Sequence, residues 1–290
     1  MQVAQSDYRD LTDAEVSRLV AHLREQYRGV FDEQMIQAHV GEFVQSRFAD
    51  SLAAVVAASG APGDTLLDIG CGYGAFVLSC RRQGLDAIGY ELEAFEVAFA
   101  RQRLQRIAPA ADAGTVFQKG DAGRLPFADK AFSTVTLLNV LEHVPDYRAV
   151  LAEAVRVVRP GGRLLVVCPN YAAFRREAHY HVPWLPFLPR AVASRYLRWL
   201  GRNPAFFETS IHYCTNWGVM AALRQLGMRT ASLDVLRLDH PELFAGARTR
   251  QALQQLRGAG LMPLLKAAYQ AAFRNPFKSS VMIVATRRAP

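Results

Sequence analysis

Short apolar runs alternate with amphipathic segments through the middle of the chain. The apolar runs, which predict five strands, lie at 66–69, 87–90, 115–118, 133–138 and 163–168. Segments with helical spacing separate them at 75–83, 93–107 and 147–158. Strands that alternate with helices form parallel βαβ units with right-handed crossovers. The pattern therefore predicts a doubly wound α/β sheet, and two later runs at 230–238 and 279–286 predict further strands.

Helical segments are also predicted ahead of the first strand. Apolar residues recur at helical spacing through Leu11, Val16, Leu19, Val20 and Leu23. Thr12 or Asp13 can cap this helix. A second helical stretch covers 34–58 and ends at the Gly/Pro break at 60–63. We expect residues 1–62 to form a helical cap, which lies either over the ligand-binding edge of the sheet or away from it.

Two stretches after the fifth predicted strand interrupt this pattern. Residues 171–214 are rich in aromatic residues, histidine and proline, and such proline density is not tolerated in regular core elements. We expect a partly helical lid there. From 215 to 290 the pattern of the sheet resumes with a helix at 215–226, and a mostly helical insertion at 241–275 interrupts it again.

The composition limits the kinds of binding partner and the cellular compartment that we expect for this chain. The 290 residues are 51% hydrophobic, and the formal charge of +8 is scattered, whereas a nucleic-acid groove requires a concentrated basic stripe. The four cysteines have no CxxC pairing, which is typical of free thiols in a reducing compartment. There is no signal-peptide core in residues 1–10 and no apolar run of membrane-spanning length. We expect a cytoplasmic protein without a nucleic-acid partner.

Peripheral contact with a membrane is a separate hypothesis. Residues 261–274 are apolar and carry Lys266 and Arg274, a pattern that a helix at a lipid surface would share with an ordinary amphipathic packing helix. The sequence carries no signal for a particular oligomeric state.

The strongest chemical signal lies at residues 66–74. The first apolar run contains Asp68, and three glycines follow at alternate positions: Gly70, Gly72 and Gly74. Glycine lets the backbone approach a ligand closely and adopt angles that side chains forbid. Ligands of open α/β sheets sit beyond the carboxyl ends of the strands, so we expect a cofactor at this turn.

Two classes of cofactor fit the glycine pattern. Gly70-x-Gly72-x-x-Ala75 satisfies the dinucleotide fingerprint, and Glu91 lies near the expected distance for a ribose-binding acid. A pyrophosphate gains nothing from a carboxylate placed before the loop. A ligand with an ammonium or sulfonium charge would gain from Asp68. Asp68 therefore favours a cationic nucleoside, with an NAD-dependent oxidoreductase as the alternative.

Residues 66–74 resemble motif I of class I S-adenosylmethionine-dependent methyltransferases of type 11. Further stretches that resemble this family follow in order at 88–91, 120–122, 139–144 and 159–165. The resemblance implies a cofactor-binding core at 63–170 and a Rossmann-like, mostly parallel seven-stranded sheet whose last two strands form an antiparallel hairpin. It also implies transfer of a methyl group from S-adenosylmethionine to a small or lipid-linked acceptor at oxygen, with S-adenosylhomocysteine as product.

The resemblance assigns roles to residues around the loop. It implies that Glu91 holds both ribose hydroxyls, that Asp121 and Ala122 meet the adenine, and that the glycine loop holds the methionine end near Asp68. The predicted cofactor residues are Asp68, Gly70, Cys71, Gly72, Gly74, Glu91, Leu92, Asp121, Ala122 and Asn139.

His143 is the candidate general base. It follows the fourth predicted strand, and the ordinary pKa of histidine suits proton abstraction near neutrality. The alternative is a structural role at the start of a local helix. Some ubiquinone-pathway O-methyltransferases of this family carry another acid three residues before the Glu-His pair and depend on a metal. Asn139 stands at that position, so we expect no metal.

We expect the lid to select the acceptor. Its candidate residues are Tyr171, His179, Tyr180, His181, Trp184, His212 and Tyr213. The alternative is an aromatic plug that closes the small core of the insertion. A further hypothesis is that the chain is a non-catalytic binding protein that keeps the methyltransferase fold.

Overall fold

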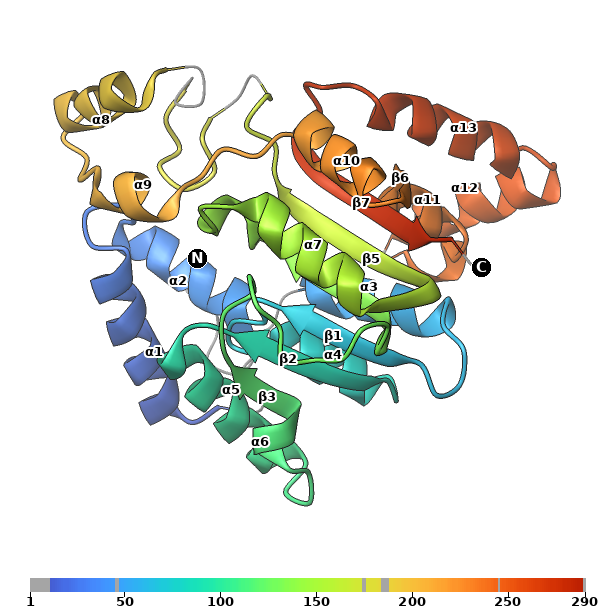
Figure 1. The fold of residues 1–290 in the computed structure, drawn as a ribbon, viewed down its shortest axis with the longest axis horizontal. Helices are drawn as coiled ribbons and strands as arrows, with labels where there is room; N and C mark the ends of the chain where they lie inside the picture. The colour runs from blue at the N-terminus through green and yellow to red at the C-terminus, as the bar shows by residue number, and fades with distance from the viewer. Residues whose placement is uncertain (1–10, 45–46, 174–175, 184–187, 245, 289–290) are drawn as a thin grey trace.

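A computed structural model describes residues 11–44, 47–173, 176–183, 188–244 and 246–288. A seven-stranded sheet with the order β3-β2-β1-β4-β5-β7-β6 forms its centre (Figure 1). The strands are β1 Thr65–Ile69, β2 Asp86–Glu91, β3 Phe117–Lys119, β4 Phe132–Leu138, β5 Val158–Pro169, β6 Met228–Ser232 and β7 Ser280–Arg287. Strands β1 to β5 run parallel, whereas β7 is antiparallel to β5 and β6. The predicted doubly wound sheet is confirmed.

Helices cover both faces of this sheet (Figure 1). They are α1 Asp13–Gln26, α2 Glu33–Val44, α3 Arg47–Ala58, α4 Ala75–Arg82, α5 Ala94–Ile107, α6 Ala113–Val116, α7 Tyr147–Val157, α8 Arg190–Trp199, α9 Ala205–Ser210, α10 Asn216–Gln225, α11 Leu233–Leu238, α12 Ala247–Gly258 and α13 Met262–Phe273, with short 3₁₀ turns η2 Leu141–His143 and η4 Pro241–Leu243. Side chains alternate between the faces of a strand. Leu67 accordingly packs in one core with α7 and α10, and Leu66 packs in another with α3 and α4.

Two of the N-terminal helices, α1 and α2, lie at the carboxyl ends of the strands, where the glycine loop is. Helix α1 begins with a capping box between Thr12 and Glu15. The ring of Phe43 in α2 lies 5.4 Å from the ring of Tyr73 in the glycine loop. Figure 1 shows α1 and α2 on the side toward which β1 and β2 point. Of the two predicted placements, the structure therefore has the one over the binding edge.

Two predicted element boundaries were wrong, whereas the helical stretch predicted at 34–58 contains α2 and α3, with residues 45 and 46 outside the described residues. The start of the third predicted strand is the short helix α6, because the Asp112 side chain accepts a hydrogen bond from Gly114 and caps it. The predicted strand at 230–238 ends at Ser232, whose hydroxyl accepts from the Asp234 amide and so begins α11.

The two predicted insertions are both partly helical. The lid contains α8 and α9, and the stretch between β6 and β7 contains η4, α12 and α13. Of the predicted lid residues, Trp184 lies outside the described residues. Within the described part of the chain, no helix combines the length and the apolar character needed to cross a membrane.

Candidate active site

The three glycines of the loop differ in what surrounds them. All three have a positive φ, at 71° for Gly70, 52° for Gly72 and 80° for Gly74. A Cβ on Gly70 would lie 2.3 Å from a methyl group of Val140, and one on Gly74 would lie 2.8 Å from the Phe117 ring. For Gly72 the nearest atom would be a Glu96 carboxylate oxygen at 3.5 Å. Gly70 and Gly74 therefore fix the loop against the core, while Gly72 leaves its backbone approachable.

Glu91, the last residue of β2, forms a hydrogen bond with the other side of this loop. Its Oε2 accepts from the Gly72 amide at 3.0 Å, and its Oε1 accepts from the amides of Leu92 and Glu93 at 2.6 and 3.0 Å. A carboxylate has about four lone-pair sites, so it retains capacity for a ligand hydroxyl. The Leu92 side chain beside it is 57% exposed. The structure thus brings Glu91, Leu92 and Gly72 together as predicted neighbours.

Asp68 is buried beneath the loop rather than open to it. It is 2% exposed, and one carboxylate oxygen accepts from the Thr136 hydroxyl of the adjacent β4 at 2.5 Å. Burial raises the pKa of Asp68 to about 7, the Thr136 hydrogen bond opposes the rise, and the charge of Glu91 adds to it. Asp68 can therefore be neutral or ionised near pH 7, and a positive charge bound close to it would favour the ionised form.

Cys71 does not offer its side chain to the crevice. The thiol is buried between the loop and β2, and a Cβ on Gly89 of that strand would lie 2.6 Å from its sulfur. The Cys71 amide also donates to the Tyr90 carbonyl at 3.3 Å. The close strand packing turns the Cys71 side chain inward, and a contact between Cys71 and the cofactor stays a prediction.

The turn after β3 supplies two more of the predicted cofactor residues, Asp121 and Ala122. Asp121 is exposed, and its Oδ1 accepts from the Gly123 amide at 2.9 Å, which closes a tight turn that also contains the half-buried Ala122. The preceding residue, Gly120, donates its amide to the Glu91 carbonyl at 2.9 Å. Asp121 and Glu91 thus lie at neighbouring strand ends, on the same edge of the sheet.

Asn139 lies on the opposite side of the loop, directly after β4. It is exposed and has a φ of 57°, a left-handed conformation that asparagine tolerates better than most residues. Its amide donates to the Val167 carbonyl at 2.7 Å. This bend directs the chain so that Val140 packs on Gly70 and η2 follows beside the loop.

His143 ends η2 and contacts the lid. Its Nδ1 donates to the Ser210 carbonyl at 2.8 Å, and its ring lies 5.1 Å from the His179 ring and 6.0 Å from the Phe206 ring. Burial lowers the pKa of His143 to about 4, and the nearby His179 contributes to the decrease. The predicted base is therefore neutral, with the lone pair on Nε2, and it also ties η2 to α9.

The other lid residues divide between the two predicted roles. Tyr180 is 1% exposed, donates to the Asn203 carbonyl at 2.7 Å and accepts from the Phe207 amide at 3.1 Å, so it belongs to the core of the insertion. The ring centroids of Tyr171 and Tyr213 lie 5.0 Å apart in that core. The His212 amide donates to the Glu142 carbonyl of η2 at 2.7 Å, and His181 is exposed. His179 is the predicted lid residue whose ring meets His143.

Comparisons with known proteins agree with this geometry. Residues 67–166 match the family described as Methyltransferase domain. The demethylmenaquinone methyltransferase of Beutenbergia cavernae is 31% identical over 212 residues, 69% of this chain and 82% of that protein. The 27-O-demethylrifamycin SV methyltransferase of Amycolatopsis mediterranei is 36% identical over 215 residues, 71% of this chain and 77% of that protein.

The chain belongs to the class I S-adenosylmethionine-dependent methyltransferases. It is an enzyme of small-molecule methylation that takes its methyl group from S-adenosylmethionine, and not an NAD-dependent oxidoreductase. The YcgJ protein of Bacillus subtilis, 18% identical, has the same fold with a TM-score of 0.50 over 84% of this chain and all of that one.

The charges around the methyltransferase loop fit a methyl donor that carries sulfonium and ammonium groups. Asp68, Glu91 and Glu96 lie near Cys71 of the loop, and no Lys or Arg of the described residues forms an ion pair with any of the three. Burial raises the pKa of Glu96 to about 8, and the charges of Glu91 and Glu93 add to it. A ligand with sulfonium and ammonium charges would supply the positive charge that this group lacks.

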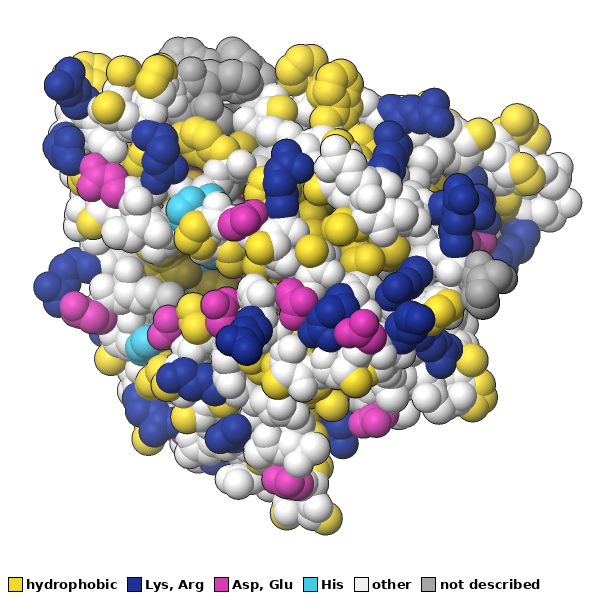
Figure 2. All heavy atoms as spheres, in the orientation of Figure 1, with side chains coloured by type: hydrophobic (Ala, Val, Ile, Leu, Met, Phe, Trp, Pro, Cys, Tyr) yellow, Lys and Arg dark blue, Asp and Glu magenta, His cyan; other side chains and the backbone are white. Residues whose placement is uncertain are grey.

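Aromatic side chains from the helical cap and the lid meet above this acidic group. The Phe206 ring of α9 lies 5.2 Å from the Tyr27 ring at the end of α1 and 5.5 Å from the His179 ring. Figure 2 shows a hollow with an apolar floor on the same side of the molecule, between histidine side chains above and acidic side chains below. The rings of Tyr27, His143, His179 and Phe206 contact one another where the cap, η2 and the lid meet, and we call this ring cluster the acceptor chamber.

Sequence reasoning missed Glu177, which lies 3% exposed in the lid. Its Oε1 accepts from the Tyr171 hydroxyl at 3.1 Å and from Nδ1 of His179 at 2.9 Å. Its Oε2 accepts from the amides of His179 and Tyr180 at 2.8 and 2.6 Å. The only signal in the sequence was an acid two residues before a histidine.

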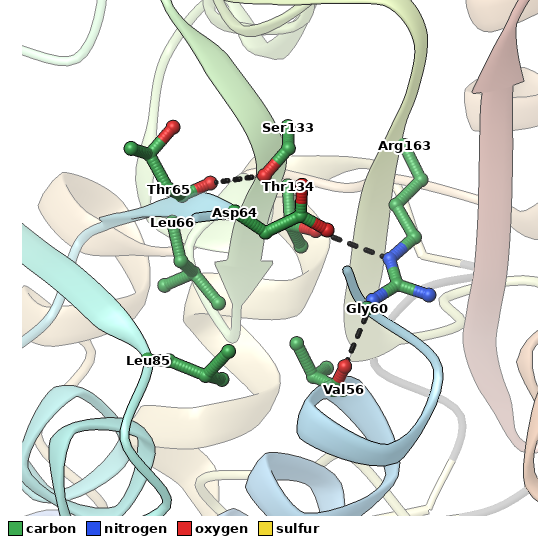
Figure 3. Close-up of a pocket in the computed structure, with 9 residues that line it drawn as sticks. All are labelled: Val56, Gly60, Asp64, Thr65, Leu66, Leu85, Ser133, Thr134 and Arg163. Carbon is green, nitrogen blue, oxygen red and sulfur yellow. Dashed lines mark hydrogen bonds between the residues drawn. The ribbon is translucent and has the colours of Figure 1, made fainter. Parts of the chain in front are cut away.

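A recess at the other end of the strands has a structural role. It lies by the amino ends of β1 and β4, and Arg163 fills it (Figure 3). The guanidinium donates to the Thr134 hydroxyl, to the Ser59 hydroxyl and to the Val56 carbonyl at 3.1, 2.7 and 3.0 Å. These bonds fasten the end of α3 to the sheet, away from the glycine loop.

Proposed function

We propose that this methyltransferase methylates a hydroxyl oxygen of an aromatic small molecule, free or lipid-linked. The observation that carries the proposal is the acceptor chamber, where two imidazoles and two aromatic rings lie beside the glycine loop. Flat rings pack well against such side chains, and an imidazole can accept a hydroxyl proton near neutral pH. The relative named for the 27-O position of rifamycin SV supports an oxygen acceptor.

We assign the cofactor contacts to four groups of this chain. Glu91 would accept from the ribose hydroxyls, Asp121 from the adenine amino group, and Asp68 with Glu96 would face the positive charges of the methionine end. When bound, S-adenosylmethionine supplies a methyl group on a positively charged sulfur. The chain then has to align the acceptor oxygen with that carbon and to keep water out.

The helical cap, 1–62, and the lid, 171–214, would exclude water. Besides the contact between Tyr27 and Phe206, the Asn203 amide donates to the Gly29 carbonyl at 3.4 Å. These contacts join two segments far apart in the sequence across the chamber. Substrate entry would require them to separate.

We expect Glu91→Gln to weaken binding of S-adenosylhomocysteine about ten- to hundredfold, because hydrogen bonds to a charged group contribute about 1.5–3 kcal/mol. Glu93→Gln is the matched control, since Glu93 is exposed and its side chain caps nothing. Titration calorimetry with both variants measures the difference. Equal affinities would refute the role of Glu91.

The acceptor class is tested with S-adenosylmethionine and a panel of 1-naphthol, 4-nitrophenol, an alkyl alcohol and a primary amine. We expect the aromatic hydroxyls to gain one methyl group and the amine to gain none. Mass spectrometry with fragmentation locates the methyl group. Methylation of the amine alone, or of ring carbon alone, would show that the oxygen acceptor is wrong.

A further inference from the structure

Two imidazoles border the acceptor chamber, and different partners orient them. Nδ1 of His143 donates to a neutral carbonyl, that of Ser210, at 2.8 Å. Nδ1 of His179 donates to a carboxylate oxygen of Glu177 at 2.9 Å. The rings lie 5.1 Å apart at an interplanar angle of 72°. A base that becomes positively charged is stabilised more by an adjacent carboxylate than by an amide dipole.

Glu177 is arranged to stay ionised. Burial by itself raises the pKa of its carboxyl, but the hydrogen bonds from His179 and Tyr180 and the charge of His179 outweigh it and hold the pKa below its ordinary value. Its side chain is inaccessible to solvent, and within the described residues His179 is its ion-pair partner. An imidazolium at His179 would therefore neutralise a buried charge.

The hydrogen bond also fixes which nitrogen of His179 is free. Because an ionised carboxylate accepts only, Nδ1 of the ring carries a proton, and in the neutral form of the ring the lone pair is on Nε2. The side chain is 13% exposed and touches the His143 and Phe206 rings, both of which border the chamber. No described residue donates to or accepts from Nε2 of His179.

We propose that Nε2 of His179 is the base that takes the acceptor proton, with Glu177 as the residue that positions it. This inference rests on the proposed oxygen methylation. The hydroxyl oxygen forms a bond to the methyl carbon, the carbon–sulfur bond breaks with its electron pair left on sulfur, and the hydroxyl proton goes to Nε2. After product release, His179 returns that proton to water.

His143 has a different part in this arrangement. Burial lowers its pKa to about 4, and the Ser210 hydrogen bond and the charge of Glu177, which both favour the imidazolium, do not offset the burial. It supports the His179 ring from η2. Three further titratable groups lie near this pair. Burial raises the pKa of Glu142 to about 7. Tyr171 lies beside Glu177, and His212 lies near His143.

The first test is nitrogen NMR of histidine-labelled enzyme bound to S-adenosylhomocysteine. We expect the neutral His179 ring to carry its proton on Nδ1, and Glu177→Gln to weaken that preference. A proton on Nε2 in the wild-type enzyme would overturn the dyad. The tautomer in the wild-type enzyme decides the matter even where Glu177→Gln fails to fold.

The second test measures methylation of 1-naphthol. We expect His179→Gln to lower kcat about 10²- to 10³-fold, the range of general-base contributions, with unchanged affinity for S-adenosylhomocysteine. The loss should be much smaller with 4-nitrophenol, which is largely ionised without help. His143→Gln, the control on the facing ring, should lose less than His179→Gln for both probes.

The outcomes separate this inference from the proposed function. Transfer to oxygen that proceeds unchanged in His179→Gln, or that depends more on His143, would overturn the dyad alone. A wild-type enzyme that methylates neither aromatic hydroxyl would overturn the oxygen acceptor, and the dyad's role with it.

Discussion

Gly70→Ala is expected to remove most of the affinity for S-adenosylhomocysteine and about 3 kcal/mol of unfolding free energy. Gly70 has a φ of 71°, which strains any residue with a side chain. The added Cβ would also lie 2.3 Å from a Val140 methyl group, so the loop or η2 must move. Urea unfolding and titration calorimetry measure the two losses.

Two variants separate the crowding from the backbone strain. Gly84 has a φ of 80°, and a Cβ added there would have no neighbouring atom within 4 Å, so Gly84→Ala should cost about 1 kcal/mol and leave ligand binding intact. Adding Val140→Ala to Gly70→Ala should restore part of the stability, relative to Val140→Ala alone. If Gly70→Ala costs no more than Gly84→Ala, contact with Val140 does not fix the loop.

The local part of this site was predictable from sequence, and the packing was not. Alternating glycines after an apolar run indicate a loop at a strand end whatever surrounds it. That Gly70 packs on Val140 depends on β1 pairing with β4 in the register Asp68 to Thr136. Those two residues are 68 positions apart, and no local pattern sets that register.

The errors have the same origin. The apolar run at 230–238 suits a strand or a short helix, and the Ser232 hydroxyl bond decides for a helix after the first residues. In the lid, Tyr180 and His179 are adjacent in sequence, yet one closes the core of the insertion and the other borders the chamber. Glu177 was missed because its partners are defined only once the lid has folded.

The second large effect concerns the buried acid under the loop. We expect Asp68→Asn to raise the free energy of unfolding above that of the wild type. This gain should be about 3 kcal/mol larger at pH 8 than at pH 4. The pKa of Asp68 is raised to about 7 in the folded state, so its carboxyl binds a proton more tightly folded than unfolded. Its contribution to stability is complete below the unfolded pKa and is lost as the pH rises through about 7. Urea unfolding across this pH range measures the gap.

Asp68→Asn should weaken the binding of the methyl donor more than the binding of its product. S-adenosylmethionine carries a sulfonium charge that S-adenosylhomocysteine lacks, so ionised Asp68 favours the donor by about tenfold. In wild type, that preference should grow between about pH 6 and 8, as Asp68 ionises. Asp68→Asn should lose the part of the donor preference that follows the ionisation of Asp68. It should keep the part near pH 8 that follows the ionisation of Glu96.

Thr136→Val tests whether Asp68 is the group that titrates. The Thr136 hydroxyl donates to Asp68 and lowers its pKa, so its removal should move the pH window upward without removing the charge. Thr136→Ser keeps the hydroxyl and should leave the window in place. A donor preference that has the same pH dependence in Asp68→Asn as in wild type would exclude Asp68 as its source. The stabilised but weakly binding variant that we expect instead would show that the enzyme keeps a destabilising carboxylate because its cofactor is cationic.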